Sequence, residues 1–192
     1  MIKLILRKGR EESLRRFHPW VFSGAVAEIQ GRPAEGDIVA VHASDGTLLA
    51  YGHYQIGSIA VRVLSFDDAA LRPDFFEQRI AAALAMRRTV GLAGVSGAAT
   101  NCYRLVHGEG DNLPGLIIDY YDGVCVMQAH SVGMFRSKNR ICEALKAVYG
   151  PTLKAVYDKS SGTAPFKAGL DLVDGYLYSA ESFHECEQVG SE

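Results

Sequence analysis

The chain has 192 residues, of which 48% are hydrophobic and 22% are charged, and its formal net charge at pH 7 is -2. This composition is ordinary for a globular protein and allows one sizeable core or two small ones. No apolar run approaches the ~20 residues of a membrane helix, and the start MIKLILRKGR lacks a signal-peptide pattern. We therefore expect a cytoplasmic protein without a membrane partner.

The charges are unevenly distributed along the chain. Residues 1–32 carry seven basic side chains against three acidic ones, whereas residues 170–192 carry six acidic side chains and neither lysine nor arginine. A basic head on a slightly acidic chain indicates an anionic partner near the N-terminus.

The first 66 residues are predicted to contain several short strands separated by turns. Apolar side chains alternate along these strands, and turn residues such as Asp45-Gly46 mark where the strands end. Short strands with glycine turns at this spacing are typical of a small β-barrel. The expected strands cover residues 2–6, 38–41, 48–51 and 58–65.

A dense group of basic side chains follows the first expected strand. Lysine and arginine neutralise phosphates, and aromatic faces accept unstacked bases, so such a group favours RNA binding over a merely solvated surface. Trp20 and Phe22 follow closely, but we expect both in the core, because a small barrel has few large residues to fill it. The candidate RNA-binding residues are Arg7, Lys8, Arg10, Arg15, Arg16 and His18.

Residues 67–100 are expected to form a connector with one helix. Pro73 suits a first helical turn, and Gly91 is a natural stop. Apolar residues recur at the spacing of one buried helix face. These residues are Phe76, Ile80, Ala83 and Leu84.

The remaining chain is predicted to be an α+β domain over residues 101–180, followed by an acidic tail over 181–192. A sheet with one helix on its face explains the order of apolar runs. Strands are expected over 103–107, 116–121, 124–129, 152–157 and 176–179, and a helix over 134–149. Gly110 and Gly115 are expected to hold turns that a β-carbon disfavours.

Three polar residues between the first two of these strands allow a different interpretation. His107, Glu109 and Asp111 could serve a small hydrolase if their side chains converge in a pocket, although acids beside glycines are more often turn formers. Gly108-Glu109-Gly110 is not a dinucleotide fingerprint, because Leu113 replaces its third glycine.

Metal and thiol chemistry are not indicated. The six histidines include no HxxxH or HExxH pair, so no metal site is expected. The four cysteines form no CxxC pair, and Cys125 and Cys142 lie in apolar patterns typical of buried free thiols.

Three segments carry a specific resemblance. They are HPWVFSGAV at residues 18–26, YRLVHGEGDNLPGLIIDYY at 103–121 and QAHSVGM at 128–134. Their sequences and order resemble the ribosomal RNA large subunit methyltransferase I type, a family that uses S-adenosylmethionine to methylate carbon 5 of a cytosine in 23S ribosomal RNA. The resemblance implies a PUA-like RNA-binding barrel over residues 1–66 and the family's middle domain after the connector.

The same resemblance implies what this chain should not do alone. It shows no xGxGxG turn, no Asp-Pro-Pro motif and no cysteine matching the family's nucleophile; neither Cys102 nor Cys186 fits. We therefore expect a fragment without the class I methyltransferase domain, without catalytic residues and without a bound cofactor. Its expected role is to position 23S ribosomal RNA for a C-terminal catalytic domain, with a possible homodimer. A free-standing RNA-binding adaptor is the alternative.

Overall fold

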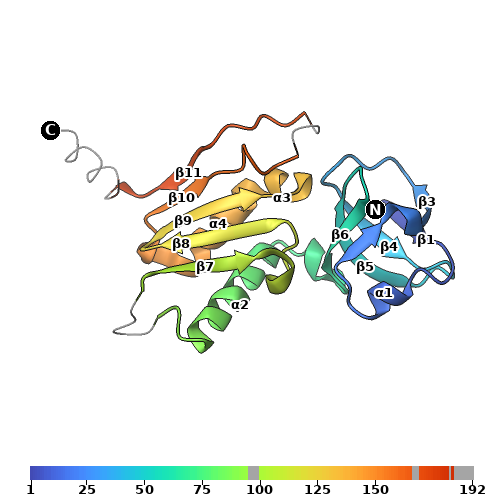
Figure 1. Ribbon diagram of the computed structural model, residues 1–192, viewed down its shortest axis with the longest axis horizontal. Coiled ribbons are helices and arrows are strands. Elements are labelled where there is room, and N and C mark those ends of the chain that lie inside the picture. Colours follow the sequence, from blue (N-terminus) through green and yellow to red (C-terminus); the bar gives the residue numbers. More distant parts are fainter. Residues whose placement is uncertain (95–99, 166–168, 182, 184–192) are drawn as a thin grey trace.

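The computed structural model describes residues 1–94, 100–165, 169–181 and 183 (Figure 1). Within them the strands form two sheets that follow one another along the chain, with few helices. This arrangement confirms the predicted α+β class. None of the described helices is both long and apolar enough to cross a membrane.

The first sheet contains six strands in the order β2-β6-β5-β4-β1-β3. Its neighbours are antiparallel except for β1 and β4, which are parallel. The strands are β1 (Lys3–Leu6), β2 (Trp20–Phe22), β3 (Val26–Gln30), β4 (Ile38–His42), β5 (Leu48–Tyr54) and β6 (Ile59–Ser65).

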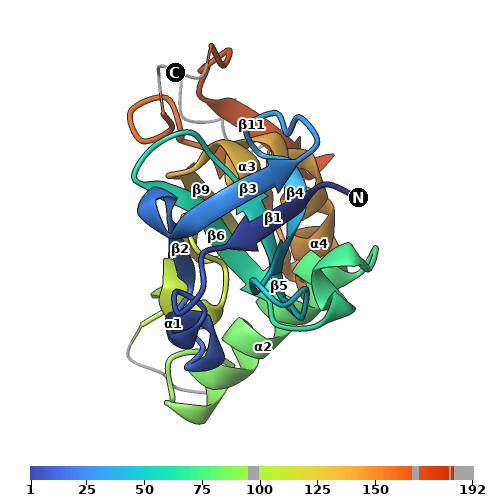
Figure 2. The ribbon, with the colours of Figure 1, turned by 90° about the vertical axis from the view of Figure 1, so that its right-hand side faces the viewer.

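This sheet curves around its own core. The edge strands β2 and β3 are joined only by the three-residue 3-10 turn Ser23–Ala25, so they must lie close together, as a small barrel requires. Figure 2 shows the sheet from the side opposite the second sheet. The core consists of Leu4, Leu6, Leu14, Val21, Val39, Val41, Ala50, Val61 and Val63.

Three elements of this half were missed in the sequence, and one of them is the three-residue strand β2. Strand β3 pairs with β1, although VAEIQ is largely exposed and shows little apolar alternation. Helix α1 (Glu12–Arg15) is only four residues long and buries a single side chain, Leu14. None of the three elements has an amphipathic pattern long enough to recognise.

The second sheet contains five strands in the order β11-β10-β9-β8-β7. Only β9 and β10 are parallel, because helices connect them, whereas the other neighbours are antiparallel. The strands are β7 (Cys102–His107), β8 (Leu116–Tyr121), β9 (Val124–Ala129), β10 (Ala155–Asp158) and β11 (Gly175–Ser179).

Helices cover one face of the second sheet. Helix α2 (Phe75–Thr89) packs against α4 (Lys138–Tyr149), which passes behind β8 and β9 in Figure 1. The predicted apolar face of α2 is buried in the same core as this sheet. The helix expected over 134–149 is instead divided at Ser137 into α3 (Val132–Arg136) and α4.

Three smaller expectations concern the turn between β8 and β9, the cysteines and the acidic tail. Asp122 and Gly123, with φ of 45° and 94°, form the two-residue turn between β8 and β9. Cys125 and Cys142 are buried free thiols, as expected. Most of the acidic tail, including Cys186, lies outside the described residues. The proposed domain boundaries stay predictions.

Candidate functional site

The basic cluster predicted from the sequence lies at one end of the first sheet, on the segment from β1 through α1. All five of its lysine and arginine side chains are exposed. Within the described ranges none of them forms an ion pair, whereas basic residues elsewhere, such as Arg72 and Lys154, bind neighbouring acids at 2.8 and 2.7 Å. The cluster therefore leaves its charge available to a partner. Its members are Arg7, Lys8, Arg10, Arg15 and Arg16.

Two of the six candidate residues also have structural contacts. The Arg7 Nε donates a hydrogen bond to the Val26 carbonyl oxygen at 3.0 Å, which ties this side chain to β3. The His18 ring is partly buried, and its Nδ1 accepts a hydrogen bond from the Trp20 amide at 3.1 Å. His18 thus shapes the entry into β2, and its role in RNA binding stays a prediction.

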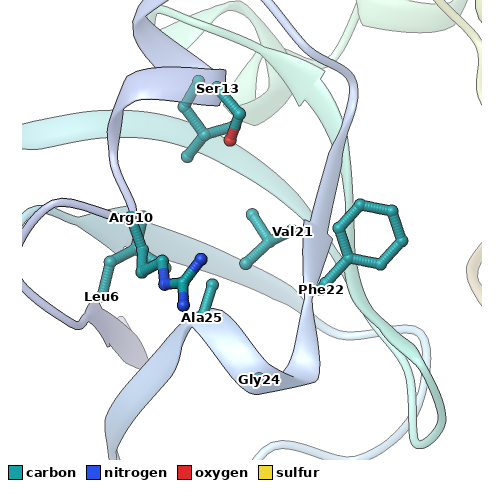
Figure 3. A pocket seen from close by; sticks show the side chains of 8 residues that line it. Leu6, Arg10, Ser13, Val21, Phe22, Gly24 and Ala25 are labelled. Carbon is teal, nitrogen blue, oxygen red and sulfur yellow. The ribbon is translucent and has the colours of Figure 1, made fainter.

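A hollow of about 290 Å³ lies beside this cluster. Figure 3 shows the Arg10 guanidinium reaching across it above Ala25, while the Phe22 ring points away from it. The hollow therefore combines an apolar floor with one positive charge. It is lined by Leu6, Arg10, Ser13, Leu14, Val21, Phe22, Gly24 and Ala25.

The expectation that Trp20 and Phe22 fill the barrel core is wrong. Phe22 is 49% exposed, and its neighbour Val21 occupies the core position of β2 instead. Trp20 is partly buried at the junction of the two halves, where its Nε1 donates a hydrogen bond to the Glu109 carboxylate at 2.8 Å. Because side chains alternate along a strand, the buried Val21 turns its two neighbours outward.

The three residues of the hydrolase alternative have separate partners. Both carboxylate oxygens of Asp111 accept hydrogen bonds from Arg87, at 2.6 and 2.7 Å, and one also accepts the His107 amide. Glu109 instead binds Trp20.

A hollow of about 360 Å³ borders His107 and Asp111 but not Glu109. The acid in this hollow is already bound by Arg87 and the His107 amide, so no free carboxylate faces the histidine. The arrangement does not supply the converging triad that the hydrolase alternative requires.

Only one of the two glycines singled out in this turn has the expected strain. Gly115 has φ of +84°, and a β-carbon on it would lie 2.8 Å from the Ser131 hydroxyl oxygen. Gly110 has no positive φ and no atom near its β-carbon position, so the prediction for Gly110 is wrong. Gly108 and Asn112 hold left-handed conformations instead, with φ of 53° and 56°.

A buried histidine lies where the two sheets meet. His53 on β5 is 4% exposed, and a β-carbon on Gly133 of α3 would collide with its ring. The His53 Nδ1 has no hydrogen-bond partner within the described chain. Burial, assisted by the positive charges of Arg140 and Arg62, lowers the pKa of His53 to about 4.

The resemblance also implies S-adenosylmethionine, and the described residues do not fit it. A doubly wound cofactor site needs a glycine-rich turn between a parallel strand and a helix. The corresponding turn here, from β9 into α3, reads His130-Ser131-Val132-Gly133, and the packing of His53 on Gly133 covers it. The described part of the chain also has no group of three side chains able to hold a metal ion.

Comparison with known proteins supports both halves of the description. Residues 4–66 match the family model of the PUA-like domain. A SAM-dependent methyltransferase from Streptococcus mutans is similar in structure, with a TM-score of 0.72 and 20% identity over 94% of this chain and 44% of that one. The structure of a methyltransferase complexed with SAH aligns with a TM-score of 0.73 and 20% identity, over 94% of this chain and 43% of that one. At this identity the likeness concerns the fold.

Curated relatives are similar at higher identity. The chain is 39% identical over 179 residues to ribosomal RNA large subunit methyltransferase I of Pseudoalteromonas translucida. It is 41% identical over 183 residues to the protein of the same name from Shewanella amazonensis. The alignments cover 92% of this chain but only 43% and 44% of these relatives, so it spans less than half of their length. The predicted resemblance is therefore confirmed: the chain combines a PUA-like match with similarity, over most of its length, to ribosomal RNA large subunit methyltransferase I.

Proposed function

We propose that this chain is the RNA-binding region of an S-adenosylmethionine-dependent ribosomal RNA (cytosine-5) methyltransferase. It positions 23S ribosomal RNA, and methyl transfer belongs to a separate class I domain. The observation that carries this proposal is an exposed basic cluster that forms no ion pair with any described residue, at Arg7, Lys8, Arg10, Arg15 and Arg16. The cluster lies within the PUA-like match over residues 4–66.

The physical basis of the proposal is phosphate neutralisation. An RNA strand carries condensed counterions, and each arginine or lysine that contacts a phosphate releases them, so affinity falls as salt rises. Arginines already paired with acids contribute less, since their charge is partly neutralised. The absence of ion pairs within the described cluster therefore favours a polyanion over a solvated face.

The second half of the chain supports this role because it holds the first sheet in a fixed orientation. The Trp20–Glu109 hydrogen bond and the packing of His53 on Gly133 join the two sheets. A base delivered to a neighbouring catalytic domain needs such a fixed geometry, because small misplacements cost large factors in rate. The proposed partner of the joined halves is one ribosomal RNA segment.

The test replaces Arg15 and Arg16 together by alanine and measures binding of a 23S RNA fragment at several salt concentrations. Each lost phosphate contact should reduce the slope of log K against log salt by about 0.7 for single-stranded RNA. Because both side chains are exposed, the fold should change in stability by less than about 0.5 kcal/mol.

A matched control replaces Arg72 and Lys154, whose charges are already paired with Asp68 and Asp122. This control should bind as the parent protein does. If the Arg15 and Arg16 variant keeps native circular dichroism together with unchanged affinity and slope, the cluster is not the phosphate-binding surface and the proposal is wrong.

A further inference from the structure

Helix α1 ends in a conformation that its sequence should disfavour. The Phe17 amide donates to the Leu14 carbonyl at 2.9 Å, and the His18 amide donates to the Ser13 carbonyl at 3.0 Å. These two bonds define a Schellman motif, whose residue after the C-cap adopts a left-handed conformation and is usually glycine. Here that residue is Phe17, with φ of +61°. A β-carbon makes this conformation unfavourable.

Burial does not compensate for the strained backbone of Phe17. Its side chain is 72% exposed, among the most exposed large apolar residues of the described chain. The ring meets Phe66, which directly follows β6, in an edge-to-face contact with centroids 5.0 Å apart and an interplanar angle of 85°. Phe66 is itself 37% exposed. Contact with Phe66 therefore leaves Phe17 largely exposed, and core packing does not explain the choice of phenylalanine.

The surroundings of this ring indicate what could cover it. Arg15 and Arg16 immediately precede Phe17, are exposed and form no ion pair within the described residues, so two positive charges lie next to this aromatic residue along the chain. An exposed aromatic face beside arginines suits a ligand with a flat π-system on an anionic backbone. A purely apolar partner would leave these charges uncompensated.

We propose that Phe17, which lies in T-shaped contact with Phe66, is a stacking platform for one unpaired nucleobase of the bound RNA. This inference rests on the proposed function, and it assigns the aromatic pair to base contact while the arginines contact phosphate. Phe17 is exposed at the end of α1, where its backbone is left-handed, and Phe66 contacts one side of its ring. Strained positions that persist without packing benefit are often found at ligand sites.

The experiment compares Phe17→Gly with the parent protein. Glycine suits the left-handed backbone, so the variant should fold with a melting temperature no lower than that of the parent. The probe is an oligouridine of about ten nucleotides, a length within single-strand binding sites of this kind. Loss of one stacked base should weaken its binding by about 5- to 150-fold. The salt slope should stay unchanged, because no phosphate contact is lost.

Two controls separate stacking from other effects. Phe17→Trp keeps an aromatic face and should retain most of the affinity. An abasic ribose-phosphate strand of the same length should bind equally well to the parent and to Phe17→Gly.

Each contrary outcome has a distinct meaning. Unchanged oligouridine affinity in Phe17→Gly overturns the stacking platform, while the proposed function stands if the Arg15 and Arg16 variant still loses affinity. If the parent binds no RNA at all, the proposed function fails first. Unchanged RNA affinity combined with a change in sedimentation would assign the Phe17–Phe66 pair to a contact between two copies of the chain, which also overturns the platform.

Discussion

Asp111→Ala should destabilise this protein far more than Asp119→Ala, although each aspartate is bound by two nitrogens of one arginine. Asp111 and Arg87 form their pair at 2.6 Å with side-chain exposures of 7% and 13%. Asp119 and Arg104 form theirs at 2.9 Å with exposures of 20% and 47%. The two pairs have the same chemistry and differ mainly in burial.

The magnitudes follow from that difference in burial. Removing one partner of a buried ion pair leaves an uncompensated charge and costs about 3–5 kcal/mol, whereas an exposed pair contributes about 0.2–1 kcal/mol. Asp111 also accepts a hydrogen bond from the His107 amide, and this amide would lose its partner in the variant. For a chain of this size, about 2–4 °C of melting temperature correspond to 1 kcal/mol. Asp111→Ala should therefore lower the melting temperature by about 6–20 °C, and Asp119→Ala by less than about 4 °C.

The assay is thermal unfolding of both variants, followed by a double-mutant cycle between Arg87 and Asp111. Arg87→Ala should cost about as much as Asp111→Ala, and the double variant should cost much less than the sum. Equal losses for the two aspartates would refute the argument from burial. A stable Asp111→Ala variant would indicate that this carboxylate is not structural and would return weight to the hydrolase interpretation.

Three further changes test other parts of the description. Gly115→Ala should cost about 1–3 kcal/mol in denaturant unfolding, while Gly110→Ala should be nearly neutral, because only the former has a left-handed backbone and a close neighbour. Burial lowers the pKa of His53 to about 4, so the unfolded chain binds a proton at this residue at a higher pH than the folded protein does. The free energy of unfolding should therefore fall by about 3 kcal/mol between pH 6.5 and pH 4. His53→Gln should remove this loss in urea titrations. Glu109→Ala should shift the emission of Trp20, the single tryptophan, and cost about 0.5–1.5 kcal/mol.

Much of the fold could be predicted because its elements have strong local patterns. The face of α2 and the hairpin at Asp122-Gly123 follow from apolar periodicity and turn chemistry. Strand β3 could not be found in this way, because it is an edge strand whose burial is partial and whose partner, β1, lies about twenty residues earlier. The interruption at Ser137 likewise has no sequence signal, because neither a glycine nor a proline stands at that position.

The candidate site was only partly readable from the sequence. The density of basic residues identified the cluster, since exposure of lysine and arginine is the usual outcome. Neither the anchoring of Arg7 to β3 nor the left-handed backbone of Phe17 has a sequence signal, because both depend on how α1 returns to the sheet.

Trp20 and Glu109 belong to two of the three sequence segments that indicated a relationship to known proteins, and they meet in the structure. Their hydrogen bond spans the junction of the two sheets. Nearby, burial lowers the pKa of the Arg62 guanidinium, and the negative charge of Glu109 opposes this shift. Trp20, whose size predicted a place in the barrel core, instead holds the barrel against the second sheet. The hydrogen bond across the junction therefore gives both segments a structural role, because it joins the first sheet to the second.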